Sequence, residues 1–367
     1  MVSHTNRLYL RRLLRSRFPK VILVLIILIN ILDVLRIHRN LLDADHTPAP
    51  KLSQPPERIY IASMHFNNER VIRDHWGPAV IELSKLLGKE NVFVSVYESG
   101  SWDKTKHELN KMALELENMG VPHRVEMSDS THKDEIENPD KGEGWIDTPR
   151  GKRELRRIPF LAKLRNRTLQ DLINLQKKGE HFDKILFLND VVFTIDDVLK
   201  LLGTNGGDYA AACSLDFSRP PEYYDTFALR DTSVAMPTEP FTSSSKLRFR
   251  GIPDSLAEHH LEGCECCLIH ADNPLTKTRG VYLNPHVRVG YNSAAYQAVH
   301  PERGAWVSTW QIFSGLWINR VMRWVSAPFD SWVVRRRVAA WEREGMGRRE
   351  PGEFCLINEM QVLVERA

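Results

Sequence analysis

The chain has 367 residues, of which 42% are hydrophobic and 26% charged, an ordinary balance for a folded protein. This balance excludes wholesale disorder and a protein with many membrane spans, and the length fits one enzyme-sized domain with appendages. The net charge of +3 gives no overall basic field, so we expect no nucleic-acid partner. Five cysteines are too few for a small disulfide framework, and their odd number leaves a thiol outside any intrachain pairing.

An apolar run near the start of the chain predicts a membrane anchor. It covers residues 21–35 (VILVLIILINILDVL), although Asn30 and Asp33 interrupt its far end. Six arginines and lysines precede the run and only two follow it closely, which places residues 1–20 in the cytosol as a tail. No small-residue cleavage site follows, so we prefer a signal-anchor to a cleaved signal peptide or a buried core helix. The rest of the chain is then lumenal.

The remaining chain divides by composition into three parts. Residues 36–57 include a proline-rich stretch without apolar periodicity and read as a stem linker. A catalytic domain is expected over residues 58–301, and a Trp- and Arg-rich helical extension over residues 302–367. In a lumenal protein, Asn166-Arg167-Thr168 is a candidate glycosylation site, although the helix expected there argues against its use.

Strands and helices alternate along the first half of the catalytic domain. The pattern predicts a parallel sheet with helices on both faces, that is, an α/β fold. In such sheets, ligands bind outside the carboxyl ends of the strands. The expected strands are residues 58–64, 91–97, 122–127 and 184–188, and the expected helices are residues 76–87, 105–119, 154–175 with a kink at Pro159, and 195–202.

Polar side chains follow three of the predicted strands. These exits are residues 65–69 (HFNNE), 98–103 (ESGSWD) and 189–193 (NDVVF). Carboxylates there can accept hydrogen bonds from a nucleoside or coordinate a hard divalent cation. A turn or a helix cap would explain any one exit, but three together favour a binding site. No dinucleotide-binding or P-loop glycine motif occurs, which disfavours dinucleotide oxidoreductases and P-loop phosphotransferases.

Asp190 is the strongest single candidate, because a buried strand delivers it to the sheet edge. One carboxylate together with phosphate oxygens suits Mg²⁺ or Mn²⁺, and the cation would neutralise a leaving diphosphate. Residues 150–167 (RGKRELRRIPFLAKLRNR) concentrate cations beside that strand. They form either a solvated helix face or a diphosphate-binding group. The best-placed members for the second reading are Arg157, Lys163 and Arg165.

Five blocks of sequence, in the same order, carry a family resemblance. They resemble the fungal capsule-associated α-1,3-mannosyltransferase family. The resemblance implies a Rossmann-like GT-A nucleotide-sugar fold with a mostly parallel central sheet, and retaining transfer of mannose from GDP-mannose with Mn²⁺ or Mg²⁺. It also implies a type II Golgi membrane protein and a mannose-containing glycan or glycolipid acceptor. The blocks are RIYIA with NNE (residues 58–62 and 67–69), VSVYESGSWD (94–103), RIPFLAKLRN (157–166), FLNDVVF (187–193) and YDTFALRD (224–231).

The resemblance also implies roles for individual residues. Asn189-Asp190-Val191 stands where such enzymes keep an Asp-x-Asp motif, so Asp190 is expected to bind the metal. His270, Asp272 or His286 is expected to complete the site. Asn189 departs from the motif by one carboxylate. Retaining transfer needs no dedicated base if the departing phosphate takes the acceptor's proton. The other implied residues are Glu69, Glu98 and Ser99 near guanosine, Arg165 and Asn166 near the donor, and Asp225, Arg230, Asp231 and Glu265 at the sugar or acceptor.

A cysteine-rich stretch, residues 258–267 (EHHLEGCECC), superficially resembles a zinc cluster. It lacks the second, separated cysteine pair of structural zinc sites, so we favour a lumenal disulfide involving one of its thiols. Cys213 is one candidate partner. Residues 267–270 are expected to form a strand that ends at Ala271-Asp272.

Tryptophans mark the C-terminal extension. Trp310, Trp317 and Trp324 are seven residues apart and predict one face of a helix. We expect this face to pack against the catalytic domain, and the alternative is a helix that lies on the membrane. Two other functions also stay open. One is transfer from GDP-fucose or a UDP-sugar, and the other is a catalytically silent assembly factor, which Asn189 supports.

Overall fold

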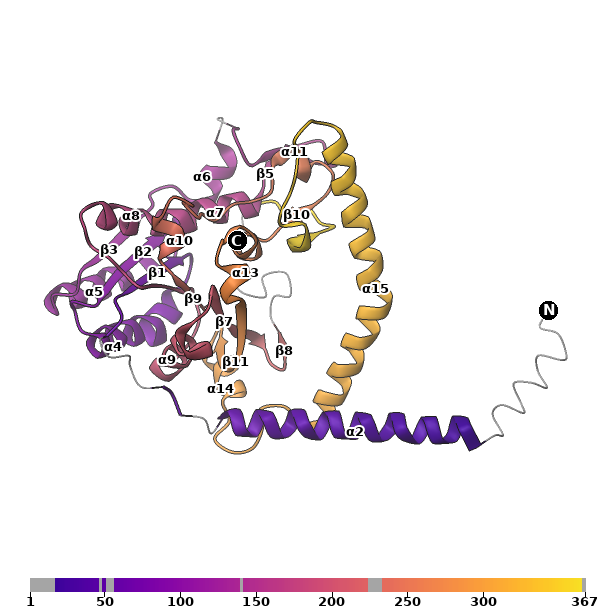
Figure 1. Ribbon diagram of the computed structural model, residues 1–367. Coiled ribbons are helices and arrows are strands. Elements are labelled where there is room, and N and C mark those ends of the chain that lie inside the picture. Colours follow the sequence, from indigo (N-terminus) through magenta and orange to yellow (C-terminus); the bar gives the residue numbers. More distant parts are fainter. Residues whose placement is uncertain (1–16, 46–47, 51–55, 139–140, 224–232, 365–367) are drawn as a thin grey trace. The chain divides into compact units, whose positions relative to one another are not determined.

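The computed structural model describes residues 17–45, 48–50, 56–138, 141–223 and 233–364 (Figure 1). The chain forms two units, which we describe separately. The first unit comprises residues 1–47 and 301–325, and the second comprises residues 48–300 and 326–367. The helix α15 (Thr309–Arg343) belongs to both, because the boundary follows Val325.

A mostly parallel central sheet forms the core of the second unit, which confirms the α/β prediction. Its order is β11-β7-β9-β6-β1-β2-β3, with β8 paired to β7. The four strands from β6 to β3 are parallel, whereas β9 is antiparallel to both of its neighbours. The strands are β1 (Ile59–His65), β2 (Val92–Glu98), β3 (His123–Met127), β6 (Lys184–Leu188), β7 (Ala211–Arg219), β8 (Glu222–Tyr223), β9 (Ser233–Pro237) and β11 (Val281–Gly290).

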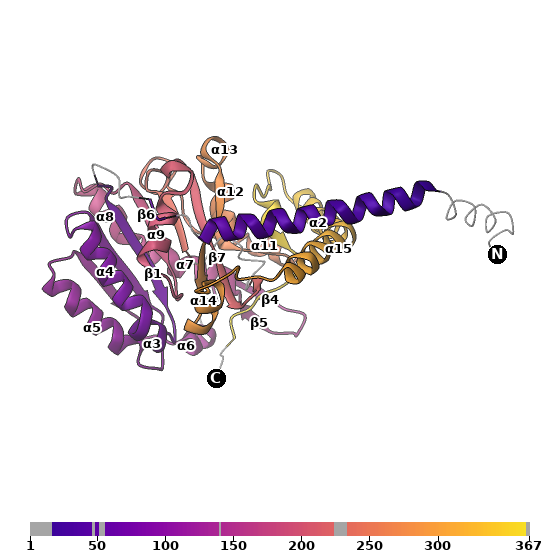
Figure 2. The same cartoon turned by 90° about the horizontal axis from the view of Figure 1, so that it is seen from below.

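Both faces of the sheet are covered because its strands are apolar at successive positions. In β1, Ile59 and Ile61 belong to one buried cluster, and Tyr60 and Ala62 belong to another. The first cluster takes in η1, α4, α5 and α9, and the second takes in α7, α8, α10 and α12 (Figures 1 and 2). These elements are η1 (Ile72–Trp76), α4 (Gly77–Leu87), α5 (Thr105–Asn118), α7 (Arg157–Thr168), α8 (Gln170–Lys177), α9 (Ile195–Leu202), α10 (Glu239–Thr242) and α12 (Glu265–Asp272).

Shorter elements complete the second unit. Two small antiparallel pairs, β4 with β5 and β10 with β12, lie outside the central sheet. The remaining elements are α3 (Glu69–Val71), α6 (His132–Glu137), β4 (Trp145–Asp147), β5 (Arg153–Leu155), η2 (Thr204–Gly207), α11 (Asp254–Ala257), β10 (Glu262–Gly263), α13 (Thr276–Arg279), α14 (Ser293–Val299), η3 (Glu353–Cys355) and β12 (Leu356–Ile357).

One secondary-structure prediction was confirmed only in part, and another was wrong. The helix expected over residues 154–175 begins at Arg157, after β5, and is divided into α7 and α8. Pro159 lies in the first turn of α7, where backbone N–H groups have no partner within the helix, so it is accommodated without a kink. The strand expected over residues 267–270 is part of α12. Its short apolar run fits either structure, and the Leu268 N–H donates to the Cys264 carbonyl with helical spacing (2.9 Å).

The cysteine-rich stretch forms a disulfide, but not with Cys213. Cys267 pairs with Cys355, 88 residues further along the chain, and Cys213 is buried outside this bond. Next to the disulfide, β10 pairs with β12. The C-terminal extension is therefore tied covalently to α12, which the spacing of the cysteines alone did not indicate.

The first unit consists of α2 (Arg17–Asp45) and residues 301–325. Within α2, residues 20–43 have a mean hydropathy of 2.4, so this helix is long and apolar enough to cross a membrane. Val34 packs with Val307 and Ile312 in a small buried cluster. The expected packing of the tryptophans in a core was wrong for most of α15. Trp341 is buried, but Trp310 and Trp324 are 71% and 65% exposed.

Candidate active site at the carboxyl ends of β1, β2 and β6

The sheet order identifies one crevice for a ligand. From β1 the chain proceeds to β2 and β3 on one side, whereas β6 lies on the other side of β1. The strand order therefore reverses between β1 and β6, and in open α/β sheets ligands bind outside the carboxyl ends at such a point. The residues that follow these two strands are 66–69 and 189–193, which are two of the three predicted exits.

A hydrogen bond joins the two exits across this crevice. The Asn68 side-chain amide donates to Asp190 Oδ2 (3.1 Å). Asn68 is itself fixed, because its N–H donates to Thr105 Oγ1 (2.7 Å) and its Oδ1 accepts from the Phe66 N–H (2.9 Å). Asn67 has a φ of 55°, a left-handed conformation that asparagine tolerates better than most residues and that turns the chain out of β1. Asp190 is thus oriented by the neighbouring strand.

The exit of β2 is bonded to the exit of β1. The Asn67 N–H donates to Ser101 Oγ (2.9 Å), and Asn67 Oδ1 accepts from the Trp102 N–H (3.1 Å). One turn further on, the Glu69 N–H donates to Asp103 Oδ2 (3.1 Å). The three predicted exits therefore form one continuous, hydrogen-bonded rim, which confirms that they gather at the same edge of the sheet.

Glu98 and Ser99 are buried at the carboxyl end of β2. The buried Glu98 accepts from the Ser101 N–H through Oε1 (2.5 Å), and its Oε2 is 3.7 Å from Lys106 Nζ. The next residue, Gly100, has a φ of +73°, and a Cβ there would meet the Ser130 carbonyl oxygen at 2.1 Å. Glycine is therefore required at this turn, where two backbones approach each other closely.

Three ring side chains at this rim were not predicted individually as site residues. Phe66 stacks on His132 (3.7 Å between centroids) and meets Trp102 edge to face (5.1 Å). Trp102 is 56% exposed, and His132 Nε2 is 3.1 Å from Ser99 Oγ. Burial lowers the pKa of His132 to about 4, so the ring is neutral near pH 7. The capping box of Thr131 and Asp134 starts α6 at this histidine and was the available sequence signal.

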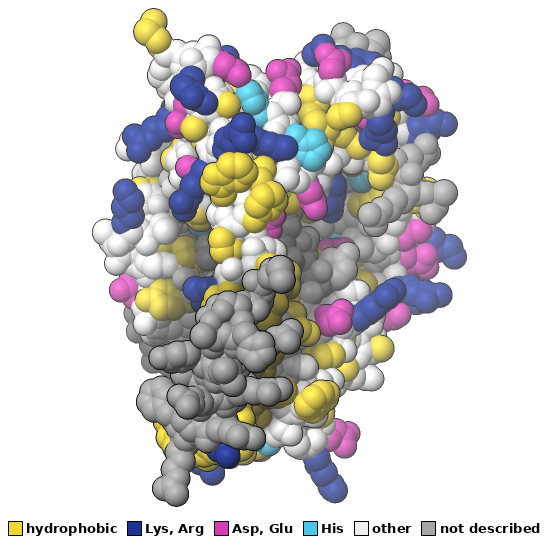
Figure 3. Space-filling model, turned by 90° about the vertical axis from the view of Figure 1, so that its right-hand side faces the viewer, with side chains coloured by type: hydrophobic (Ala, Val, Ile, Leu, Met, Phe, Trp, Pro, Cys, Tyr) yellow, Lys and Arg dark blue, Asp and Glu magenta, His cyan; other side chains and the backbone are white. Residues whose placement is uncertain are grey.

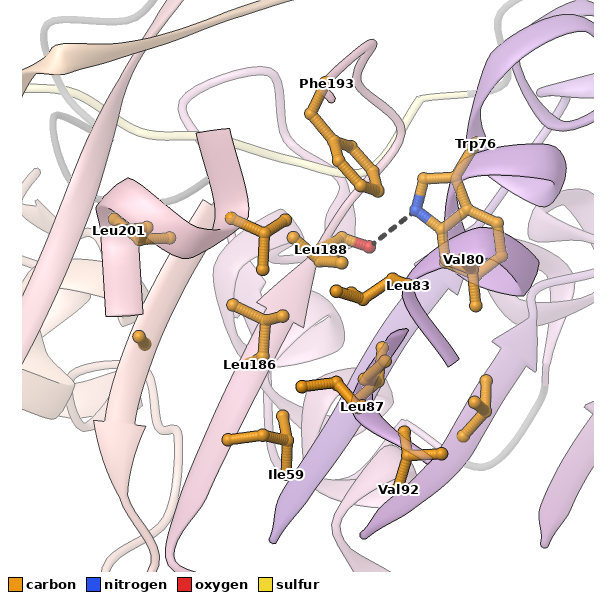
Figure 4. Packing of buried hydrophobic residues seen from close by; sticks show 14 of the residues in the cluster. Ile59, Trp76, Val80, Leu83, Leu87, Val92, Leu186, Leu188, Phe193 and Leu201 are labelled. Carbon is orange, nitrogen blue, oxygen red and sulfur yellow. Dashed lines mark hydrogen bonds between the residues drawn. The ribbon is translucent and has the colours of Figure 1, made fainter. Parts of the chain in front are cut away.

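The end of β6 is held rigidly beneath Asp190. The Trp76 indole N–H donates to the Leu188 carbonyl (3.2 Å), as Figure 4 shows, and Ser63 Oγ donates to the same oxygen (2.5 Å). Asn189 is buried, and Val192 then pairs with Gly290 at the end of β11. These contacts hold the backbone on both sides of Asn189-Asp190.

The predicted cations of α7 divide into two kinds. Arg157 and Lys163 are exposed, whereas Arg165 is buried and forms an ion pair with Glu265 of α12 (3.2 Å). Asn166 makes two hydrogen bonds to the backbone of Phe249, one to its carbonyl (2.8 Å) and one from its N–H (3.0 Å). Arg165, Asn166 and Glu265 therefore connect elements of the fold, and Asn166 is engaged within helix α7 rather than presented for glycosylation.

Two of the other metal candidates, Asp272 and His270, both lie on α12. Asp272 accepts two hydrogen bonds from Arg250, and His270 lies buried on α12 beside Arg165 and Phe187. Among the described residues, the one cluster of three metal-ligating side chains is Cys264, Glu265 and Cys266, all buried. The predicted residues Asp225, Arg230 and Asp231 lie outside the described residues.

Sequence reasoning also missed a buried arginine. Arg156 is fully buried and forms ion pairs with Glu262 (2.6 Å) and Asp254 (2.8 Å). Burial raises the pKa of Glu262, although the adjacent guanidinium opposes this effect. This group joins the start of α7 to α11 and β10, and nothing in the one-dimensional pattern separates Arg156 from the exposed Arg157.

The chain matches the family described as Cryptococcal mannosyltransferase 1 over residues 58–234 and 232–272, more than half of its length. No curated protein matches the sequence. Both the rim and the buried α7–α12 connection lie within the matched region.

Several solved structures are similar at low identity. The mannosyltransferase PcManGT from Pyrobaculum calidifontis, in complex with GDP-Man and Mn²⁺, is 12% identical over 90% of this chain and 76% of that one, with a TM-score of 0.40. TarS from S. aureus (residues 1–349) is 13% identical over 64% of this chain and 60% of that one, with a TM-score of 0.36. Glucosyl-3-phosphoglycerate synthase from M. tuberculosis is 13% identical over 68% and 74%, with a TM-score of 0.32. Because these likenesses are weak, the assignment rests on the family match: the chain belongs to the Cryptococcal mannosyltransferase 1 family.

Proposed function

We propose that the protein is a retaining α-1,3-mannosyltransferase that transfers mannose from GDP-mannose to a mannose-containing glycan or glycolipid. Membership of a mannosyltransferase family supports the reaction class. The hydrogen bond between Asn68 and Asp190 carries the placement of the site, because it joins two polar exits across the crevice where an α/β sheet binds ligands. The donor's diphosphate would lie in this crevice.

Asp190 would hold a divalent cation, Mn²⁺ or Mg²⁺, together with the phosphate oxygens of the donor. The donors available at the rim are carboxylate and amide oxygens, which suit hard cations, and Mg²⁺-like ions need only one or two carboxylates beside phosphates. When bound, the cation supplies charge neutralisation for the departing diphosphate. The protein's contribution is orientation, because Asn68 and the bonded end of β6 hold the Asp190 carboxylate in one direction.

The nucleoside would lie against the rings beside the rim. Trp102 offers an exposed face close to Phe66 and His132, and aromatic faces stack on nucleobases. Glu98, Ser99 and Glu69 surround this position and could accept or donate hydrogen bonds to guanosine. Arg157 and Lys163, both exposed on α7, are the cations that we assign to the diphosphate.

Residues outside the described parts would complete the site. The family resemblance assigns the acceptor or the sugar face to Asp225, Arg230 and Asp231. We place the enzyme in the Golgi membrane with α2 as its anchor and the catalytic unit in the lumen, which is the usual environment for glycan assembly and permits the disulfide of Cys267.

A donor assay tests the proposal. The full-length chain, purified in detergent, is incubated with α-mannobiose and radiolabelled GDP-mannose, GDP-fucose or UDP-glucose, with Mn²⁺ or with EDTA. We expect labelled product from GDP-mannose alone, its loss in EDTA, its return on adding Mn²⁺, and an α-1,3 bond on linkage analysis. Product from a UDP-sugar would refute the donor assignment. If no donor gives product and GDP with Mn²⁺ does not raise the Tm, the enzymatic assignment fails.

A further inference from the structure

The middle of α15 carries large apolar side chains at its surface. Six side chains between residues 321 and 332 are 49–70% exposed, and Trp310 and Ile318 earlier in the helix are 71% and 61% exposed. Successive residues of a helix are rotated by about 100°, which places all eight within one arc of roughly 160°. We call this arc the apolar face of α15. Its members are Trp310, Ile318, Val321, Met322, Trp324, Val325, Phe329 and Trp332.

Near the two ends of α15, the opposite side of the helix is the side that packs. Near the start of α15, Ile312 is buried with residues of α2, and near its end Val338 and Trp341 are buried in the core of the second unit. By the same rotation these side chains fall opposite the apolar face. At its ends α15 therefore packs through the side opposite the apolar face, so the contacts shown there do not involve the face.

A lipid bilayer fits the apolar face better than other occupants. The face is continuous with the part of α15 that packs on α2, and α2 is apolar enough to cross a membrane. Arg320 of α15 binds the two polar residues that interrupt the apolar run of α2. It donates to Asn30 Oδ1 (2.8 Å) and to Asp33 Oδ2 (2.7 Å). Satisfied polar groups of this kind are what a helix pair needs in or beside a bilayer.

Side chains beside the apolar face also match a membrane surface. Tryptophan and arginine occur together, with Arg320 over the Trp317 ring (5.6 Å) and Arg336 over the Trp332 ring (5.5 Å). Tryptophan rings concentrate at headgroup depth, and arginines bind lipid phosphates. Apolar and cationic side chains both reach the surface on the side of the molecule shown in Figure 3.

We infer that the apolar face of α15 inserts into the headgroup region of the lipid bilayer that α2 enters, so that the protein contacts the membrane through two helices. From Trp310 to Trp332 the face is about 33 Å long, at 1.5 Å per residue. A second copy of the chain is the competing occupant. It would also cover an apolar face, but it would not bring lipid into contact with it.

Fluorescence quenching by lipids tests the inference on the full-length chain in nanodiscs of phosphatidylcholine and phosphatidylserine. An NBD label is placed at Val325→Cys on the apolar face, or at Asp330→Cys on the opposite side of the same exposed stretch, as the matched control. The native cysteines that are not in the disulfide are buried, which limits background labelling. We expect doxyl-labelled lipid to quench the label at position 325 at least about threefold more strongly than at position 330.

Three outcomes would overturn the inference. Equal quenching at both positions would mean that the helix has no lipid-facing side. A label at position 325 that is shielded from aqueous iodide but not quenched by doxyl lipid would indicate a second copy of the chain. Failure of the full-length chain to float with liposomes would remove the anchor on which the inference rests. The Tm of both labelled variants is measured to confirm that they are folded, and none of these results depends on glycosyl transfer.

Discussion

The exit of β6 and the start of α12 each carry an acidic residue that the sequence placed in the active site, and the structure treats them differently. Asp190 lies half-buried at the edge of the sheet, where Asn68 of the adjacent exit orients it. Glu265 is buried in an ion pair with Arg165. We therefore expect Asp190 to serve ligand binding and Glu265 to serve the fold, a contrast that separate variants of the two residues can test.

The physical basis of this difference is that Glu265 is buried against a charged partner, whereas Asp190 is only half-buried. In a buried ion pair each charge offsets part of the cost of removing the other from water, so engaging either side chain with a ligand would weaken the pair. A half-buried carboxylate at the sheet edge can still accept a cation. We therefore expect substitution of Asp190 to lower activity and substitution of Glu265 to lower stability.

The largest effect should come from Asp190→Asn. This change removes the charge but keeps the shape, so we expect the rate of mannose transfer to fall 10³- to 10⁴-fold, or about 4–5.5 kcal/mol, with the Tm changed by less than about 2 °C. Asp196→Asn removes the same charge from an exposed residue at the start of α9 and should keep wild-type activity. Equal activity in the two variants would show that Asp190 is not at the reacting centre.

Breaking the buried pair should instead affect folding. Glu265→Gln leaves Arg165 buried with a neutral partner, and the loss of one member of a buried pair costs about 3–5 kcal/mol of unfolding free energy. We expect a large drop in Tm with near-normal activity per folded molecule. Replacing both residues, with Arg165→Met and Glu265→Leu, should recover much of the Tm. A Glu265→Gln variant with normal Tm and abolished transfer would place Glu265 at the sugar instead.

The same contrast explains what the sequence could predict. The strand Lys184–Leu188 and the helix Ile195–Leu202 were predicted to the residue, because a short buried run and a regular helical period dominate there. The gathering of the exits followed from the parallel sheet. The sequence could not indicate that Arg165 would be buried while Arg157 is exposed, because both belong to one cationic run whose packing depends on α12, about 100 residues away.

The disulfide offers a third comparison, since its partner also came from a distant segment. Cys267 and Cys355 close a loop of 88 residues, and such a cross-link is worth about 2–4 kcal/mol, mainly by restricting the unfolded chain. We expect dithiothreitol to lower the Tm of the wild-type chain by several degrees. The double variant Cys267→Ser with Cys355→Ser should start from that lower Tm and show no further decrease. A further decrease in dithiothreitol would mean that another disulfide forms.

The smallest predicted effect is the change in stability with pH that His65, at the end of β1, should cause. His65 at the end of β1 is buried against Trp76, and burial lowers its pKa from 6.5 to about 4. Between these values the unfolded chain binds a proton that the folded chain does not, so stability falls as the pH drops below 6.5. For this group the loss is about 1.4 kcal/mol at pH 5.5, or roughly 3 °C in Tm.

His65→Gln removes this proton uptake and should therefore lose less Tm than the wild-type chain between pH 7.5 and pH 5.5. His181→Gln, at an exposed histidine, serves as the control and should follow the wild-type profile. If His65→Gln also follows that profile, His65 is protonated in the folded chain, and the rim rests on a charged rather than a neutral ring. A buried imidazolium next to the end of β1 would then add positive charge beneath the proposed diphosphate position, and the dependence on Asp190 should weaken accordingly.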